Sequence, residues 1–417
     1  MTRNSQTRRQ FLWSAAAGMT SLASLRGHSG QPQQAGPAVN CAVVGVGLRG
    51  REILRMLARI DQASLLAYCD LYPPYLRRGA RLAPQARSFE DANRMLAEVA
   101  EIQAVFVCTP THLHRQVAQT ALKAGKHVYC EAPMASTLED CRAIAKAAAG
   151  SDRVFAAGLQ NRANPLFEHA SKFIRARYLG SLVTEEGHWY ENNSWRRAVS
   201  DPAFQKAFNW RLDPEVSLGL FGEAGVHTFD NSLRFQGAYP VAVSAFGSLM
   251  KWDDGRTLPD TALCVFEYPN GLLSRFEATL TNSFREKYYL LSGGDGSILL
   301  KDVHSWWFKE VDAPTVGWEV YASREKIGNE EGIVLRANAT KLLQQGKMPS
   351  EEGGGRGELE DDPLYIALQE FLAAAAQGNP TGWGAKEGYE SAVMAIQAHQ
   401  ALAAGKRLEI DPAVFVV

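Results

Sequence analysis

The chain has 417 residues, of which 46% are hydrophobic and 21% are charged, and its formal net charge at pH 7 is −1. This length exceeds what a single hydrophobic core normally serves, so we expect two domains. The near-neutral charge and the lack of a basic run argue against a nucleic-acid partner. Six cysteines are scattered without any CxxC, and the histidines are spread out, so we expect neither a disulfide nor a metal site.

Residues 1–37 have the pattern of an export signal followed by a linker. Arg8 and Arg9 precede Phe11 and Leu12 and then a modest apolar stretch rich in Ala and Ser, which is typical of a twin-arginine signal. The stretch is too short to span a bilayer in the mature protein, so no transmembrane anchor is expected. The alternative is a disordered tail that carries an arginine pair by chance. The signal predicts a periplasmic or extracellular protein that is exported already folded.

The most informative pattern follows directly. The apolar run VNCAVV is followed by a glycine turn and then by residues at helical spacing, and the turn consists of Gly45, Val46, Gly47, Leu48, Arg49 and Gly50. Strand, glycine turn and helix in this order are typical of a dinucleotide site, where the second glycine lets the backbone approach a pyrophosphate. The alternative is a glycine-tolerant loop in another α/β protein.

A second feature supports the dinucleotide interpretation. Asp70 ends the next apolar run, 20 residues after Gly50, which is the usual distance to the acid that binds the ribose hydroxyls. Because a carboxylate there repels a 2′-phosphate, NAD is expected rather than NADP. An exported enzyme meets little free nucleotide, so we expect the cofactor to be held through turnover.

Short apolar runs and helical patterns alternate as far as residue 157. They predict a Rossmann fold, a doubly wound parallel α/β sheet, over residues 38–157. Ligands bind beyond the carboxyl ends of such strands. The residues that follow two of these strands are therefore expected on the cofactor side: Thr109, Pro110, Thr111, His112, His114, Glu131 and Pro133.

Residues 158–417 have a different pattern of apolar residues. Apolar runs such as TALCVFEY, LLSRFEATL and KYYLLSG follow one another with little helix, and Pro269-Asn270-Gly271 predicts a hairpin turn. We expect a C-terminal α/β domain with a large open, mostly antiparallel sheet, one face buried and one free for a substrate or a partner subunit. Near the end, residues 349–362 predict a loop, Asp362 and Pro363 a helix start, and residues 386–403 a second helix.

The chain resembles the Gfo/Idh/MocA family of glucose–fructose oxidoreductases and inositol dehydrogenases. The resemblance rests on the glycine turn and on residues 108–114, 125–131, 180–182 and 223–230. It implies an NAD- or NADP-dependent enzyme that acts on sugars or polyols and forms homo-oligomers through the open sheet. It also implies that Glu131 reaches the nicotinamide ribose.

Two positions depart from the family pattern. The family's Glu-Lys-Pro motif is Glu131-Ala132-Pro133 here, so the lysine that hydrogen-bonds the reacting hydroxyl is missing. The aspartate expected four residues before the catalytic histidine is Glu223. The loss of the lysine puts the family's usual alcohol dehydrogenation in question.

By this resemblance, His227 is the catalytic base and Glu223 is its carboxylate partner. Histidine suits the removal of a hydroxyl proton because its ordinary pKa lies near neutrality, and a carboxylate on the other ring nitrogen would fix the tautomer. If this segment is helical, the two side chains lie one turn apart on one face. The alternative is a surface or helix-capping pair.

Aromatic and cationic side chains occur together at two places after residue 190, a combination that suits sugar stacking and hydroxyl recognition. Packing in a core or an interface explains them equally well. The candidate substrate contacts are Arg162, Asn164, Tyr190, Trp195, Arg196, Arg197, Trp210 and Arg211.

Three functions remain open. The first is an exported NAD-dependent oxidoreductase of a sugar or polyol hydroxyl. The second is a redox-neutral NAD-dependent glycosidase that oxidises transiently, eliminates the aglycone, adds water and reduces again. The third is a nucleotide-binding protein without catalysis, which the loss of the lysine alone suggests.

Overall fold

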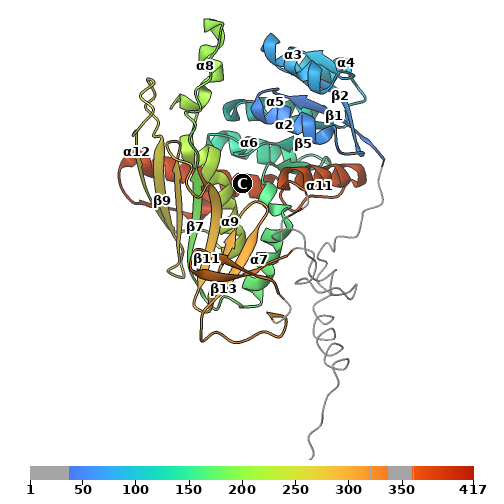
Figure 1. Ribbon diagram of the computed structural model, residues 1–417. Helices are drawn as coiled ribbons and strands as arrows, with labels where there is room; N and C mark the ends of the chain where they lie inside the picture. The colour runs from blue at the N-terminus through green and yellow to red at the C-terminus, as the bar shows by residue number, and fades with distance from the viewer. Residues whose placement is uncertain (1–36, 320–321, 337–358, 360) are drawn as a thin grey trace, which may run out of the picture. The chain divides into compact units, whose positions relative to one another are not determined.

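The structure, a computed structural model, describes residues 37–319, 322–336, 359 and 361–417 (Figure 1). The predicted export signal, and most of the loop predicted over residues 349–362, therefore lie outside the described residues. Within the described ranges, no helix has both the length and the apolar character that crossing a bilayer requires.

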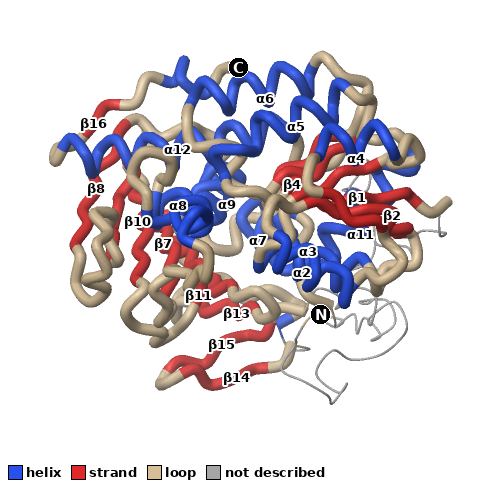
Figure 2. The backbone as a smooth tube through the Cα atoms, turned by 90° about the horizontal axis from the view of Figure 1, so that it is seen from above, coloured by secondary structure: helices blue, strands red, loops and turns tan. Residues whose placement is uncertain are grey.

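The N-terminal part contains a six-stranded parallel sheet with the order β3-β2-β1-β4-β5-β6, which confirms the predicted Rossmann fold. Helices α5 and α6 cover one face, and α2, α3 and α11 cover the other (Figure 2). The bounds are β1 Val39–Val44, α2 Leu48–Leu57, β2 Ala63–Cys69, α3 Pro73–Leu82, β3 Arg87–Phe89, α4 Ala92–Glu98, β4 Ala104–Val107, α5 His114–Lys123, β5 His127–Cys130, α6 Leu138–Ala149 and β6 Phe155–Ala157.

Two glycines allow the tight turn between β1 and α2. Gly45 has a φ of +93°, and a Cβ atom there would lie 2.5 Å from the carbonyl oxygen of Cys108. A Cβ atom at Gly50 would lie 1.8 Å from the carbonyl oxygen of Gly45. Any larger residue at either position would push the helix away from the strands.

The second sheet has ten strands in the order β14-β15-β13-β12-β11-β7-β10-β9-β8-β16, and all its pairs are antiparallel except β7 with β10. This confirms the predicted large, mostly antiparallel sheet. Its strands are β7 Leu182–Tyr190, β8 Ala242–Ser248, β9 Thr261–Glu267, β10 Leu273–Thr279, β11 Lys287–Gly293, β12 Gly296–Leu300, β13 Ser305–Lys309, β14 Arg324–Ile327, β15 Glu330–Val334 and β16 Leu408–Glu409. The predicted hairpin joins β9 to β10, with Gly271 at a φ of +85°.

The two faces of this sheet differ, as predicted. In β10, Ser274 and Phe276 are buried whereas Leu273 and Arg275 are exposed, so one face is covered and the other is open in this chain. The helices of this part of the chain are α7 Pro165–Arg175, α8 Gln205–Phe208 and α9 Val226–Gln236. Helix α9 packs closely on β7, because a Cβ atom at Gly187 would lie 2.2 Å from the side chain of Thr228.

Two C-terminal helices connect the sheets. Helix α11 (Pro363–Gln377) begins as predicted at Asp362, which accepts a hydrogen bond from the Leu364 backbone, and it then packs on the Rossmann sheet. There Phe371 lies against Phe106, with ring centroids 5.4 Å apart. Helix α12 (Ala385–Ala404) contacts both α6 and α9. The core of the N-terminal sheet is therefore completed by residues from the end of the chain.

Candidate active site

The start of α2 forms an open surface beside the glycine turn. Gly47 is the N-cap of α2, no side chain caps this end, and a Cβ atom at Gly47 would meet nothing within 4 Å. Leu48, the first residue of the helix, is 55% exposed. Unpaired backbone amides at an open helix N-terminus suit a pyrophosphate, so this surface fits the cofactor that the glycine turn predicts.

Asp70 lies directly beside this surface. Its two carboxylate oxygens accept hydrogen bonds from the backbone nitrogens of Val46 at 2.7 Å and of Tyr72 at 2.9 Å. Burial raises the pKa of Asp70, and the two backbone hydrogen bonds oppose that rise. The carboxylate is thus fixed next to the glycine turn, in the position expected for binding ribose hydroxyls.

We expect Gly47→Ala to fold normally and to bind NAD about tenfold more weakly, because the added methyl group occupies the space that the pyrophosphate needs. The φ of Gly47 is −63°, which alanine adopts without strain. Gly382→Ala is a matched control, because a Cβ atom there also meets nothing within 4 Å. Calorimetric titration with NAD and thermal unfolding of both variants measure the two effects. Equal NAD affinity in the two variants would contradict the assignment.

Arg49 and Glu131 form an ion pair at the carboxyl ends of the parallel strands. The Nε atom of Arg49 lies 2.9 Å from a carboxylate oxygen of Glu131, and its other two nitrogens donate to Glu52 at 2.9 Å and Gln160 at 2.7 Å. Burial raises the pKa of Glu131, and the guanidinium opposes that rise. Each nitrogen of the Arg49 guanidinium therefore has a protein partner, and one of these partners is Glu131.

His114 has a different role from the one predicted. Its ring is 1% exposed, and its nitrogens face the carbonyl oxygens of Pro133 at 3.1 Å and Thr109 at 2.9 Å. It therefore holds together the two loops that follow β4 and β5. This corrects the expectation of a direct cofactor contact, because the ring is almost completely buried between these two loops.

His227 lies at the start of α9, with its ring against Trp189 of β7. The two rings are nearly parallel, with an interplanar angle of 12° and centroids 6.1 Å apart. Its Nδ1 atom is buried and has no hydrogen-bond partner among the described residues. Burial, together with the positive charges of Arg49 and Lys287, lowers the pKa of His227 to about 3. The imidazole is therefore neutral at neutral pH, which is the form that accepts a proton.

Glu223 does not hold the ring of His227 as predicted. It lies in a π-helical turn, Phe221–Gly225, and its carboxylate accepts hydrogen bonds from Thr111 Oγ1 at 3.1 Å and Arg211 Nε at 2.7 Å. The prediction assumed α-helical spacing, which does not apply where the chain closes i→i+5 hydrogen bonds. Glu223 instead connects the second domain to the loop after β4.

Trp210 and His112 contact each other at the same junction. Their ring centroids are 5.9 Å apart, and the Arg211 guanidinium lies 4.7 Å from the centre of the Trp210 ring. Trp210 is only 7% exposed. The structure therefore supports packing, the alternative stated for this residue, over direct stacking on a sugar.

Two other candidate substrate contacts are occupied by protein partners. Arg162 forms an ion pair with Asp230, with Nε 2.8 Å from one carboxylate oxygen and 3.0 Å from the other. Asn164 is fully buried, caps α7 through the Leu166 backbone nitrogen, and donates to the Asp302 carbonyl oxygen at 2.8 Å. Both side chains stabilise the fold beside the site, and the expectation that they bind substrate stays a prediction.

The remaining candidates also bind neighbouring protein groups. Tyr190 stacks on His188, with ring centroids 3.8 Å apart. Trp195 donates to Glu191 at 2.5 Å, and Arg196 pairs with Asp254 at 2.9 Å. In the described part of the chain, no hydrogen bond, ion pair or ring contact joins Tyr190, Trp195 or Arg196 to His227. Their substrate role is therefore not supported by the arrangement.

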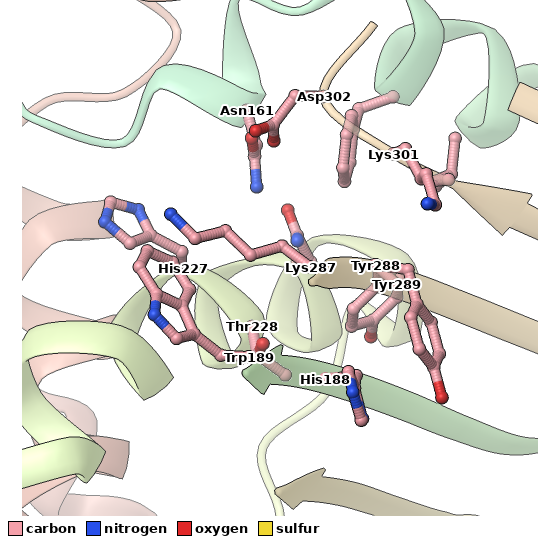
Figure 3. Close-up of a pocket in the computed structure, with 13 residues that line it drawn as sticks. Asn161, His188, Trp189, His227, Thr228, Lys287, Tyr288, Tyr289, Lys301 and Asp302 are labelled. Carbon is pink, nitrogen blue, oxygen red and sulfur yellow. The ribbon is translucent and has the colours of Figure 1, made fainter. Parts of the chain in front are cut away.

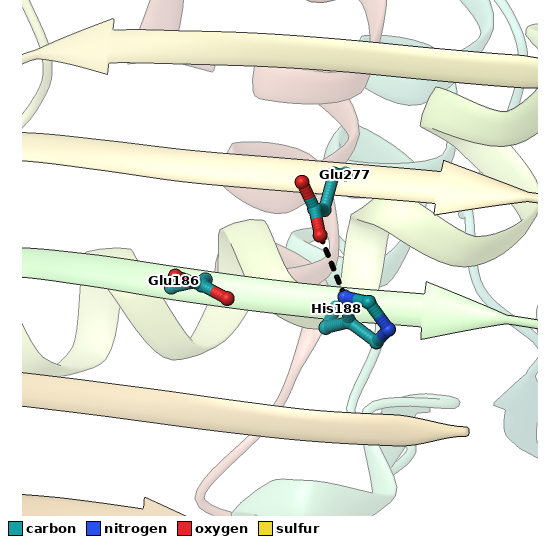
Figure 4. A group of neighbouring side chains, drawn as sticks. All are labelled: Glu186, His188 and Glu277. Atoms are coloured by element: carbon teal, nitrogen blue, oxygen red, sulfur yellow. Dashed lines mark hydrogen bonds and ion pairs between the residues drawn. The ribbon is translucent and has the colours of Figure 1, made fainter. Parts of the chain in front are cut away.

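The open face of the sheet carries one group of possible metal ligands, consisting of Glu186, His188 and Glu277 (Figure 4). Nδ1 of His188 lies 2.8 Å from Glu277. The carboxylate oxygens of Glu186 accept hydrogen bonds from Arg275 and Tyr288. Because each of these side chains already has a protein partner, a cation would have to displace existing hydrogen bonds.

Most of the residues in the pocket that His227 borders were not predicted from the sequence. Figure 3 shows the Lys287 side chain extending across Trp189 toward His227, with Asn161 and Asp302 facing it. Asn231 also lines this pocket, is 2% exposed, and has a side-chain oxygen without a hydrogen-bond partner among the described residues. These residues come from separate elements and carry no common motif. Among these residues, Asn231 lies one helical turn after His227 on α9, and this spacing was the one sequence signal that pointed to it.

A Rossmann sheet with an open pyrophosphate surface, and a neutral histidine beside a polar pocket, define a dinucleotide-dependent oxidoreductase. Residues 39–159 match the GFO_IDH_MocA family, described as an oxidoreductase family with an NAD-binding Rossmann fold. Residues 167–299 match the GFO/IDH/MocA C-terminal domain. The chain therefore belongs to the Gfo/Idh/MocA family and is an NAD-dependent oxidoreductase of that type.

Several relatives have been characterised. The chain is 28% identical to 2,7-anhydro-N-acetylneuraminate hydratase of Escherichia coli over 264 residues, which are 62% of this chain and 67% of the relative. It is 26% identical to myo-inositol 2-dehydrogenase of Thermotoga maritima over 59% of this chain and 69% of that protein. The structure of levoglucosan dehydrogenase with NADH and L-sorbose has the same fold, with a TM-score of 0.71 and 21% identity over 90% of this chain and 99% of the other.

Proposed function

We propose that the protein is an exported NAD-dependent oxidoreductase that acts on a hydroxyl group of a sugar or polyol and retains its cofactor through turnover. The observation that carries the proposal is the imidazole of His227, whose buried Nδ1 atom has no partner among the described residues, at the edge of a polar pocket. The names of the relatives, which include a levoglucosan dehydrogenase and a myo-inositol dehydrogenase, support a polyhydroxylated substrate.

Each step of the proposed reaction can be assigned to a particular side chain or to the cofactor. His227 accepts the proton of the reacting hydroxyl, because its ring borders the pocket and its buried Nδ1 atom has no hydrogen-bond partner among the described residues. The unpartnered oxygen of Asn231 accepts a hydrogen bond from a neighbouring hydroxyl, and this orients the ring. NAD, when bound along Gly47 and Asp70, supplies the acceptor for the hydride that leaves carbon.

A redox-neutral glycosidase is the second candidate. Its specific support is the hydratase among the relatives, because a hydratase adds water without net oxidation. The absence of a lysine at residue 132 also fits a changed reaction. In this alternative, transient oxidation of a ring hydroxyl acidifies the neighbouring C–H bond, the aglycone is eliminated, water adds, and the carbonyl is reduced again.

One set of spectra separates the candidates. Purified protein is incubated with NAD and a panel of sugars, polyols and aryl glycosides, and reduced-nicotinamide absorbance and released aglycone are recorded together. Lasting growth of the absorbance supports the oxidoreductase. Aglycone release without net absorbance growth supports the glycosidase. If neither signal appears while NAD still binds, the protein is a nucleotide-binding protein without this catalysis, and the proposal is wrong.

Cofactor retention has a direct measurement. An exported enzyme must regenerate its cofactor in place, so we expect NAD to accompany the protein through purification. Native mass spectrometry of the untreated protein detects the bound nucleotide and its mass distinguishes NAD from NADP. Light scattering on the same sample tests the proposed homo-oligomer. A nucleotide-free mass after gentle purification would contradict retention.

We expect replacement of the arginine pair, Arg8→Lys with Arg9→Lys, to abolish export, because the twin-arginine route recognises that pair. Arg3→Lys is a matched control, since it alters a nearby arginine outside the pair. Cell fractionation in a bacterial host with an active twin-arginine route measures the result. Export of the double variant at the level of the Arg3→Lys control would show that the pair is not the signal.

A further inference from the structure

The pocket beside His227 contains a cation that no motif assigned. Lys287 is the first residue of β11 and pairs in register with Trp189 on β7. Its Nζ atom lies 3.6 Å from the centre of the Trp189 ring, and that ring stacks on His227. The strand register therefore holds a positive charge next to the catalytic base.

Two cations act electrostatically on His227, namely Arg49 and Lys287. All three nitrogens of Arg49 are engaged by Glu131, Glu52 and Gln160. Lys287 differs, because in the described ranges it has no carboxylate within 4.0 Å and its ammonium contacts an aromatic face. An ammonium has three N–H donors, and a ring face satisfies them only weakly. Of the two lysines that line this pocket, Lys287 and Lys301, Lys287 is the one whose ammonium lies over the ring stacked on His227, so its donors are available to a substrate beside that histidine.

We infer that Lys287 donates a hydrogen bond to the oxygen of the reacting hydroxyl, taking the place of the lysine that is absent at residue 132. This inference rests on the proposed function. The family lysine would come from the Rossmann domain after β5, whereas Lys287 comes from the second sheet. In this chain the second sheet therefore supplies the charge.

The reaction balances with this assignment. The O–H bond breaks and its proton goes to His227, the C–H bond breaks and its electron pair goes with hydrogen to the oxidised nicotinamide, and a C=O bond forms. Lys287 keeps its proton throughout. Its charge stabilises the negative charge that develops on oxygen, and such a donor is worth most in a site shielded from water.

Lys287→Met tests the inference against a matched control, Lys251→Met. Lys251 also places its ammonium over a tryptophan, 4.6 Å from the centre of the Trp252 ring, but it does not line this pocket. We expect Lys287→Met to lower kcat by about 100-fold or more, as the loss of one preorganised donor does, and to leave NAD affinity unchanged. Lys287→Arg should recover part of the rate, and Lys251→Met should match wild type.

A second readout does not depend on turnover. In the cofactor-free protein, removal of the Lys287 charge should raise the pKa of His227, which nuclear magnetic resonance of the imidazole follows directly. If Lys287→Met does not fold, Lys287→Gln removes the same charge with a polar side chain.

The outcomes are distinguishable. Wild-type protein that oxidises no sugar or polyol overturns the proposed function, and this inference with it. An active wild type whose Lys287→Met variant has the kcat of the Lys251→Met control overturns the inference alone. An unchanged His227 titration together with a lowered kcat also overturns it, because the lysine would then act elsewhere than at the base.

Discussion

Replacement of His227 by glutamine is expected to lower kcat/KM by about 1,000-fold, because a positioned general base contributes about 10²- to 10⁴-fold to such a rate. Glutamine has no proton-accepting nitrogen at neutral pH. NAD affinity should not change, since the cofactor surface at Gly47 and Asp70 belongs to other elements. Steady-state kinetics on the best substrate from the sugar panel measures the loss, with calorimetric NAD binding on the same preparation.

His169→Gln is the matched control for this variant. Burial lowers the pKa of His169 to about 4, as it lowers that of His227, but His169 lies on α7 against Phe173 and outside the pocket. A similar rate loss in both variants would mean that removing a buried histidine damages the fold, and that His227 has no specific catalytic role.

In the wild type, the base form of His227 persists well below neutral pH, so kcat/KM should show no acidic limb from this group between about pH 5 and 8.

The fold could be predicted from the sequence because its signals are local. The strand, glycine turn and helix over residues 39–57 and the hairpin at residues 269–271 need only nearby residues, and both are confirmed. The packing of α11 on the Rossmann sheet could not be predicted from local signals. It depends on apolar side chains more than 200 residues apart in sequence, such as Phe106 and Phe371.

The candidate site was predicted less completely, for a physical reason. The resemblance located His227 and Glu131, but a sequence does not show which partner a charged side chain selects. Arg162 pairs with Asp230 and Glu223 pairs with Arg211, so these groups are occupied before a substrate arrives. Lys287 was missed because its position depends on the register between β11 and β7, and register is a property of the assembled sheet.

We expect the largest loss of stability when the ion pair between Arg162 and Asp230 is broken. Asp230 is 1% exposed, and Arg162→Met would leave its carboxylate buried without its partner. We expect the free energy of unfolding to fall by about 3–5 kcal/mol, the usual cost of breaking a buried ion pair from one side. The double variant Arg162→Met with Asp230→Leu should recover most of this loss, because it removes the unpaired charge. Urea unfolding of the three proteins measures the difference.

The pH dependence separates this structural role from substrate binding. Burial already raises the pKa of Asp230, and the guanidinium of Arg162 opposes that rise, so Arg162→Met should raise the pKa further. A folded-state pKa above the unfolded value means that the folded protein binds the extra proton. The stability lost in Arg162→Met should therefore return in part as the pH falls toward the unfolded-state pKa of an aspartate, about 3.9. If Arg162 instead bound the substrate, Arg162→Met would raise KM and leave the free energy of unfolding unchanged at every pH.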